Sequence, residues 1–211
     1  MGNAASATED YLKVIYGHTE WQPEPITPTG LATRLGLAPS SVTEMVKKLV
    51  VNGLVSHQPY GLIELTPDGT AAALRMVRRH RVIETWLVER MGYSWDRVHE
   101  EAEVLEHAMS DHLLDAIDDQ LGRPVRDPHG DPIPTRDGVV TRPAVRLLGD
   151  LAPGEHGVIA RISDRDPVLL RHLASDGIRL DVAVTRTNTG ASLGQAVLPR
   201  DALTSVWVAA P

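Results

Sequence analysis

The stretch PSSVTEMVKKLVVNGLV, residues 39–55, carries the clearest fold signal in the chain. Its apolar side chains recur at helical spacing over residues 42–50, and Asn52-Gly53 is a typical helix end. Ser41 and Glu44 have the spacing of a capping box near the start. The stretch therefore predicts an amphipathic helix of about three turns.

A shorter helix and a hairpin are expected on either side of it. Residues 29–35 fit a short helix capped by its first threonine, so that two helices would form a helix-turn-helix. Residues 54–58 and 62–65 form two short runs on either side of the turn Pro59-Tyr60-Gly61. This order is typical of a β-hairpin. This order predicts a winged helix-turn-helix DNA-binding domain over residues 1–72.

Helices dominate the sequence on both sides of that domain core. A first helix is expected over residues 8–20, preceded by frayed residues, and a long helix over 67–91 after the Thr66-Pro67 start signal. Two further helices follow at 95–107 and 110–121. We expect residues 73–144 to form a helical dimerisation and metal-binding domain that includes a Pro- and Gly-rich linker.

The pattern of apolar and polar residues changes at Val145. Short alternating runs between turns, including residues 157–162 and 178–184, predict a small β-barrel or SH3-like module over 145–211. Residues 166–175 fit one helix within it. The predicted fold class is therefore mainly α with small β parts: a winged helix, a helical domain and an SH3-like barrel.

Composition narrows the function classes. The 211 residues carry a net charge of −7, which argues against nonspecific nucleic-acid binding, and they include no cysteine. Any metal site must therefore use oxygen and nitrogen ligands. No apolar run approaches the roughly 18 residues of a membrane span, and the N-terminus lacks the apolar core of a signal peptide. We expect a cytoplasmic protein with no membrane contact.

One predicted helix face gathers imidazoles and carboxylates. His99, Glu103, Glu106 and His107 fall within roughly 100° of one another on a helical wheel. Residues 67–122 hold twelve acidic and six basic side chains, a net charge of −6. A solvated acidic helix face is the simplest explanation of such a pattern. Closely spaced carboxylates would also repel one another until a cation neutralises them, which indicates a candidate metal site.

Several longer motifs resemble the diphtheria toxin repressor family of metal-dependent bacterial transcription regulators. These motifs are ATEDYLKVIY (7–16), SSVTEMVKKLVVNGLV (40–55), LTPDG (65–69), RRHRVIETWL (78–87), VHEEAEVLEHAMSD (98–111) and DPHGDPIP (127–134). The resemblance covers most of the chain and implies a homodimer that binds two metal ions per chain and then binds operator DNA. Double-stranded DNA and a second copy of the chain are the implied partners.

The resemblance also implies two ligand sets. The primary set would comprise Asp10, Glu103, Glu106 and His107. The second set would comprise His80, Glu84 and His99, with Asp181 as a further candidate from the tail.

The two departures from the iron-type pattern favour manganese. Asp10 stands where iron-type members of the family place methionine, and Glu103 stands where they place cysteine. Hard oxygen ligands with imidazole favour Mn(II), although Fe(II), Co(II), Zn(II) and Ni(II) are expected to bind in vitro. Some manganese-sensing members carry another acidic residue one turn after this aspartate, where this chain has Lys13.

The start of the helix over residues 39–51 is the expected DNA-reading surface, because recognition helices meet bases and phosphates there. The candidates are Pro39, Ser40, Ser41, Thr43, Glu44, Lys47 and Lys48. Glu44 could accept from a cytosine amino group or serve the capping box. We expect metal to tie Asp10 to the helical domain and thereby to set the spacing of two recognition helices in the dimer.

Three alternatives stay open from the sequence. An Fe(II)-dependent repressor of the same family differs from the manganese interpretation at two positions only. A metal hydrolase could use the same His/Glu cluster, but no general base or oxyanion donor is recognisable beside it. A metal-independent winged-helix regulator would leave the ligand pattern unexplained. We therefore expect a repressor of metal homeostasis genes that is not an enzyme and has no small organic substrate.

Overall fold

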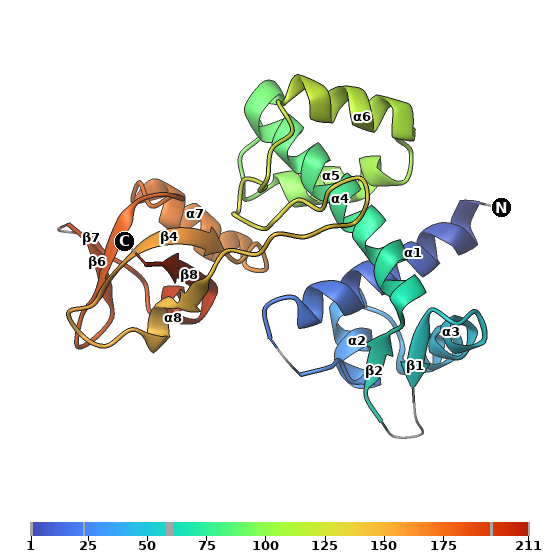
Figure 1. Cartoon of the computed structure of the whole chain (residues 1–211). Coiled ribbons are helices and arrows are strands. Elements are labelled where there is room, and N and C mark those ends of the chain that lie inside the picture. Colours follow the sequence, from blue (N-terminus) through green and yellow to red (C-terminus); the bar gives the residue numbers. More distant parts are fainter. Residues whose placement is uncertain (1, 23, 58–60, 195, 211) are drawn as a thin grey trace. The chain divides into compact units, whose positions relative to one another are not determined.

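The computed structural model describes every residue except 1, 23, 58–60, 195 and 211, and it falls into two compact units (Figure 1). One unit comprises residues 1–79 and 134–139, and the other comprises 80–133 and 140–211. Helix α4 (Pro67–Met91) contributes to both. Each unit is described separately below.

The first unit is a winged helix-turn-helix, as predicted. Its elements are α1 (Gly2–Thr19), α2 (Pro28–Leu35), α3 (Pro39–Val51), β1 (Val55–His57), β2 (Ile63–Leu65) and the first half of α4. The strands form an antiparallel pair with His57 opposite Ile63. Leu12, Leu31 and Ile63 are almost fully buried and form part of the core under the hairpin. The predicted turn at 59–61 lies mostly outside the described residues.

Two predicted helix starts in this unit were wrong. Helix α1 begins at Gly2, so Thr8 lies inside the helix and does not cap it. Helix α2 is capped by Thr27, whose hydroxyl accepts from the Gly30 N–H at 3.0 Å. Proline is favoured directly after a cap because its missing N–H needs no partner, and Pro28 occupies that place.

The capping box predicted for α3 is also absent. The helix begins at Pro39 with Ala38 at the N-cap, which makes no side-chain cap bond. Ser41 therefore lies in the first turn rather than at the cap. Glu44 instead forms an exposed ion pair with Lys47 at 2.9 Å.

The start of α4 matches the prediction closely. The Thr66 hydroxyl accepts from the Gly69 N–H at 3.1 Å, and Pro67 is the first helical residue. A Cβ atom on Gly69 would lie 1.8 Å from the Leu54 carbonyl oxygen. Glycine is thus required where the helix leaves the wing.

The helical part of the second unit consists of the end of α4 with α5 (Val98–Glu106) and α6 (Asp111–Gln120). Ile83, Val98 and Leu114 lie in the shared core. Helix α5 was predicted from Trp95 but begins three residues later. Residues 95–97 form a turn closed by the Ser94 carbonyl, because the indole of Trp95 packs against the core of the tail instead.

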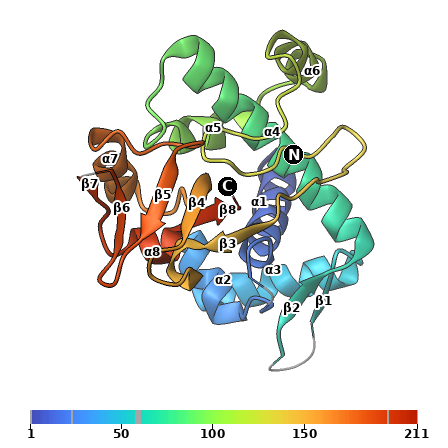
Figure 2. The ribbon, with the colours of Figure 1, turned by 60° about the vertical axis from the view of Figure 1, so that its left-hand side comes forward.

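The tail forms a six-stranded antiparallel sheet with the order β3-β8-β4-β5-β6-β7, which confirms the SH3-like prediction (Figure 2). The strands are β3 (Val145–Leu147), β4 (His156–Ile162), β5 (Ala183–Arg186), β6 (Ala191–Leu193), β7 (Ala196–Val197) and β8 (Val206–Ala209). The remaining elements are η1 (Leu148–Asp150), α7 (Pro167–Ser175) and α8 (Ala202–Ser205). Ile159, Leu173 and Val206 are buried between the sheet and its helices.

One predicted strand of the tail is shorter than expected. Only the last two residues of 178–184 join β5, because Asp181 adopts a positive φ of 65° and turns the chain just before the strand. Helix α7 fits the prediction, since the Asp166 carboxylate accepts from the Val168 and Leu169 N–H groups. The short strand β6 was not anticipated.

Candidate metal centre

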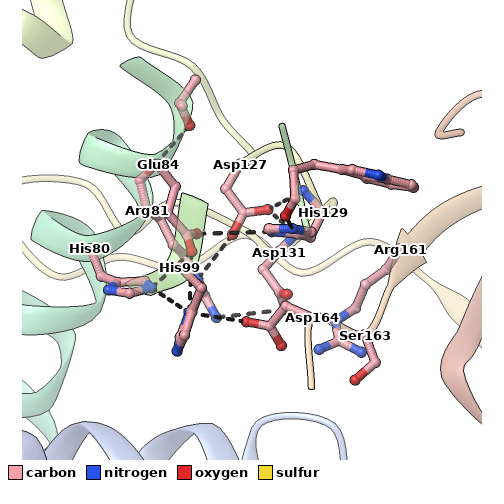
Figure 3. A network of polar contacts seen from close by, with 12 residues as sticks. His80, Arg81, Glu84, His99, Asp127, His129, Asp131, Arg161, Ser163 and Asp164 are labelled. Carbon is pink, nitrogen blue, oxygen red and sulfur yellow. Dashed lines mark hydrogen bonds and ion pairs between the residues drawn. The ribbon is translucent and has the colours of Figure 1, made fainter. Parts of the chain in front are cut away.

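Three of the predicted ligands meet between α4 and α5 (Figure 3). His80 and Glu84 lie one turn apart on α4, and His80 Nε2 is 2.9 Å from Glu84 Oε1. His99 of α5 places its Nδ1 atom 3.0 Å from His80 Nε2 and 3.3 Å from Glu84 Oε1. His80 and Glu84 are buried, whereas the His99 side chain is 47% exposed. The cluster is thus open to solvent on the His99 side.

The tail supplies a carboxylate to this cluster, but it is not the one predicted. Asp164, in the loop between β4 and α7, places Oδ2 3.7 Å from His99 Nδ1. Asp181 is exposed, and its two carboxylate oxygens accept from Arg126 at 2.9 and 2.5 Å. This ion pair lowers the pKa of Asp181. Asp164 therefore replaces Asp181 as the candidate ligand from the tail.

The other predicted ligands on or next to α5 lie beside the same cluster. Glu103 Oε1 is 3.4 Å from His99 Nε2, so its carboxylate lies beside the second set rather than apart from it. Glu106 is buried and accepts from His80 Nδ1 at 2.6 Å. His107 follows the last residue of α5, with Nε2 3.6 Å from Glu106 Oε1. The two ring nitrogens of His80 thus contact different carboxylates: Nδ1 contacts Glu106, and Nε2 contacts Glu84.

Asp10 lies on α1 in the first unit and is half-buried. The prediction that it completes the primary set rests on the family resemblance.

The electrostatics of the cluster favour an ionised Glu84. Burial by itself would raise the pKa of this carboxyl, but the charges and hydrogen bonds of His80 and His99 outweigh it and hold the pKa well below its ordinary value. A carboxylate surrounded by imidazoles in this way is ready to accept a cation without first losing a proton.

The DPHGDPIP loop contributes buried charges that sequence reasoning did not assign. Asp131 accepts from Arg161 Nε of β4 at 2.7 Å, and Asp127 Oδ2 lies 3.6 Å from Arg81 Nε of α4. Burial and the neighbouring Asp131 raise the pKa of Asp127 to about 7. His129 of the same loop is buried beside Glu84, with 3.9 Å between His129 Nδ1 and Glu84 Oε2. The motif was recognised as a linker, and only the fold shows that it packs against the cluster.

The donor set fits a divalent cation. With metal–ligand bonds of about 2.0–2.2 Å, adjacent ligands of a six-coordinate ion are separated by roughly 3 Å. The distances of 2.9, 3.0 and 3.3 Å among the His80, Glu84 and His99 ligand atoms match that spacing. Carboxylate oxygen and imidazole nitrogen together suit Mn(II), Fe(II), Co(II) or Zn(II).

The predicted DNA-reading residues form an exposed surface on α3. They are Pro39, Ser40, Ser41, Thr43, Glu44, Lys47 and Lys48, and all seven are exposed. The Thr43 hydroxyl donates to the Pro39 carbonyl at 2.9 Å, and the exposed Lys47–Glu44 pair can open readily. The surface is thus accessible to a duplex.

Comparison with known proteins identifies the family. Residues 4–62 match the model described as the iron dependent repressor N-terminal DNA binding domain. Residues 66–135 match the iron dependent repressor metal binding and dimerisation domain, and residues 146–200 match the FeoA domain. An HTH-type transcriptional regulator of Methanocaldococcus jannaschii is 40% identical over 113 residues, which cover 54% of this chain and 90% of that protein. This chain belongs to the iron-dependent repressor family.

Two further members of the iron-dependent repressor family show how far the similarity extends. The diphtheria toxin repressor of Corynebacterium efficiens is 35% identical over 64% of this chain, and the match spans 58% of that repressor's length. A solved structure described as a manganese-dependent transcriptional repressor in complex with manganese is 45% identical, with a TM-score of 0.91. That match covers 97% of this chain and 100% of the other.

Family membership places the candidate residues in named domains. The exposed surface of α3 lies in the DNA binding domain, and His80, Glu84 and His99 lie in the metal binding and dimerisation domain. Asp164 lies in the FeoA domain. No helix among the described residues is long and apolar enough to cross a membrane.

Proposed function

We propose that this chain is a Mn(II)-activated, homodimeric transcriptional repressor that binds operator DNA and controls manganese homeostasis genes in the cytoplasm. The observation that carries the proposal is the donor set, which contains carboxylates and imidazoles but no sulfur. The chain has no cysteine, and the candidate ligands around His80 are carboxylates and imidazoles. Hard ligands of this kind suit Mn(II).

We propose that each chain binds two ions, because the candidate ligands form two sets. We assign His80, Glu84, His99 and Asp164 to the second set, and Asp10, Glu103, Glu106 and His107 to the primary set. The primary assignment follows the family resemblance, with acidic residues at the two positions where iron-type members place sulfur ligands. The shared contact between His80 and Glu106 would let the two sets influence each other.

A bound cation supplies positive charge to a region in which acidic side chains outnumber basic ones. Without that charge, carboxylates such as Glu103 and Glu106 repel one another. Asp10 lies on α1, the helix that precedes α2 and α3 in the DNA binding domain. Recruitment of Asp10 to the primary set would therefore restrict the orientation of α3 and fix the half-site spacing that a dimer can read.

The relatives described above are transcription regulators, and we propose no catalytic role for this chain. A catalytic metal keeps a coordination position open for substrate or water, whereas the proposed sets use the nearby donors as ligands. Fe(II) is the second candidate activator. It is favoured by the family models, whose descriptions name an iron dependent repressor.

A selection experiment tests the proposal and identifies the operator sequence at the same time. The chelator-stripped full chain is incubated with a pool of randomised duplexes, with Mn(II), with Fe(II) under anaerobic conditions, or with chelator. We expect a discrete recovered sequence with Mn(II) and none with chelator. Recovery that is equal in chelator would exclude metal activation, and recovery with Fe(II) alone would replace manganese with iron.

The Asp10→Asn variant tests the link between metal and DNA. The recovered duplex should lose most of its Mn(II)-dependent affinity for this variant, while Glu9→Gln, the adjacent acid on α1, serves as the matched control. An Asp10→Asn protein that remains fully responsive to Mn(II) would contradict the assignment of Asp10.

A further inference from the structure

Helix α3 carries one acidic side chain, Glu44, on the face that it presents to solvent. The side chain is 66% exposed. The residues that bury the opposite face of the helix are Val42, Val46 and Leu49. Because Ala38 is the N-cap, Ser41 occupies the third helical position, where a capping box places its acid. Glu44 therefore lies beyond the start of the helix, and capping does not explain an acid there.

Two lysines compensate the charge of Glu44. Lys47 Nζ lies 2.9 Å from Glu44 Oε1, and the charge of Lys48 also acts on the carboxylate. The hydrogen bond and the charge of Lys47 hold the pKa of Glu44 below its ordinary value, so the carboxylate is ionised at neutral pH. One negative and two positive charges leave this group of three side chains with a net charge of +1. The group can therefore approach DNA phosphates, which would repel a lone carboxylate.

Stability does not account for the ion pair between Glu44 and Lys47. An exposed pair of this kind contributes little to folding, and it can open when the lysine turns toward a phosphate. The neighbouring Thr43 hydroxyl is engaged by the helix itself, because it donates to the Pro39 carbonyl at 2.9 Å. Glu44 thus brings an ionised acceptor to the surface of α3 that is expected to read DNA.

The chemistry of base edges limits what such an acceptor can read. A carboxylate can only accept hydrogen bonds, and the donors in the major groove are the amino groups of cytosine and adenine. In adenine the amino group lies beside the N7 acceptor, which repels a carboxylate. Cytosine presents its amino group with no acceptor of its own in the groove. A glutamate on the reading surface therefore favours cytosine.

We propose that Glu44 is a specificity-determining residue that accepts from the amino group of one cytosine in each operator half-site, while Lys47 and Lys48 contact nearby phosphates. This inference rests on the proposed function and deepens it by naming a base that the operator must contain. A twofold-symmetric dimer presents two copies of α3, so the cytosine should occur once in each arm of an inverted repeat.

Parallel selections with the unmodified full chain and with Glu44→Gln test the inference. Both proteins are incubated with randomised duplexes and Mn(II). Glutamine has nearly the same size but also donates, so it can pair with N6 and N7 of adenine. We expect one base pair in each half-site to change from C·G to A·T, while the other positions stay the same. Glu89→Gln, at an exposed position of α4, is the matched control and should recover the unmodified sequence.

Affinity measurements on the recovered duplex complete the test. Replacement of the cytosine read by Glu44 should weaken binding by the unmodified chain about 5- to 100-fold, the usual cost of one mismatched base pair. Glu44→Gln should bind the adenine duplex more tightly than the cytosine duplex.

Two results would overturn the inference. One is recovery of the same sequence by Glu44→Gln and the unmodified chain. The other needs no variant: the unmodified chain tolerates replacement of each recovered cytosine within twofold. Failure of the unmodified chain to recover any sequence with Mn(II) would instead overturn the proposed function.

Discussion

Asp164 Oδ2 lies 3.7 Å from His99 Nδ1, and this contact brings the loop after β4 to helix α5. The FeoA domain thus contributes a carboxylate to a cluster whose other members lie on helices. Under the proposed function, the tail supplies a ligand and therefore takes part in sensing the ion.

The first prediction concerns this carboxylate. Asp164→Asn should weaken Mn(II) binding to the second set about 10- to 100-fold, because it replaces a charged ligand with a neutral one. Isothermal titration in a His107→Ala background measures the effect. Asp181→Asn is the matched control, since Asp181 pairs with Arg126 instead. Equal affinities for the two variants would argue against a tail ligand.

The second prediction concerns the buried pair between Asp131 and Arg161. Each side chain is 5% exposed, so removal of one leaves the other charge poorly compensated. Asp131→Ala should lower the free energy of unfolding by about 3–5 kcal/mol. Asp119→Ala, which removes an exposed partner of Arg123, should change it by less than about 1 kcal/mol. Urea unfolding in chelator measures both, and similar values would show that the buried pair is not structural.

The third prediction concerns pH. The pKa of Asp127 is raised from 3.8 to about 7, so between these values the folded chain retains a proton that the unfolded chain has lost. The free energy of unfolding therefore falls as pH rises through this window. Asp127→Asn keeps an acceptor oxygen but cannot ionise.

The stability of Asp127→Asn relative to the unmodified chain should increase from pH 4 to pH 7 when both are measured in chelator. Asp137→Asn, at an exposed position, provides the control. A constant difference between Asp127→Asn and the unmodified chain across that range would show that Asp127 ionises freely.

The fourth prediction concerns dimerisation. Val104 on α5 and Leu113 on α6 are 69% and 50% exposed, and both lie in the region that matches a dimerisation domain. Leu113→Asp should raise the dimer dissociation constant at least about tenfold, since a charge would replace an apolar contact. Light scattering across a dilution series measures it, with Val168→Asp on α7 as the control. An unchanged constant would place the dimer interface elsewhere.

Local patterns predicted most of the fold because helical and strand periodicities follow from local geometry. His80 and Glu84 could be paired from the sequence, since residues four apart share a helix face. Asp164 could not be found in this way. Its approach to His99 depends on where β4 ends. The other candidate from the tail, Asp181, lies at a turn of the backbone and pairs with Arg126.

Caps and loops were the other source of error. Residue 29 was expected to cap α2, but Thr27 is the cap because Pro28 is the first helical residue. His129 was visible as part of a family motif, but nothing in the sequence shows that its ring nitrogen faces Glu84. Such contacts depend on long-range packing between the loop, α4 and the sheet.

The most direct test of manganese sensing by this chain is an EPR titration of the chelator-stripped protein with Mn(II). Two saturable sites per chain are expected, with one lost in His107→Ala and the other lost in His99→Ala. The absence of saturable Mn(II) binding in the unmodified chain, or two sites that persist in both variants, would contradict the two-site assignment.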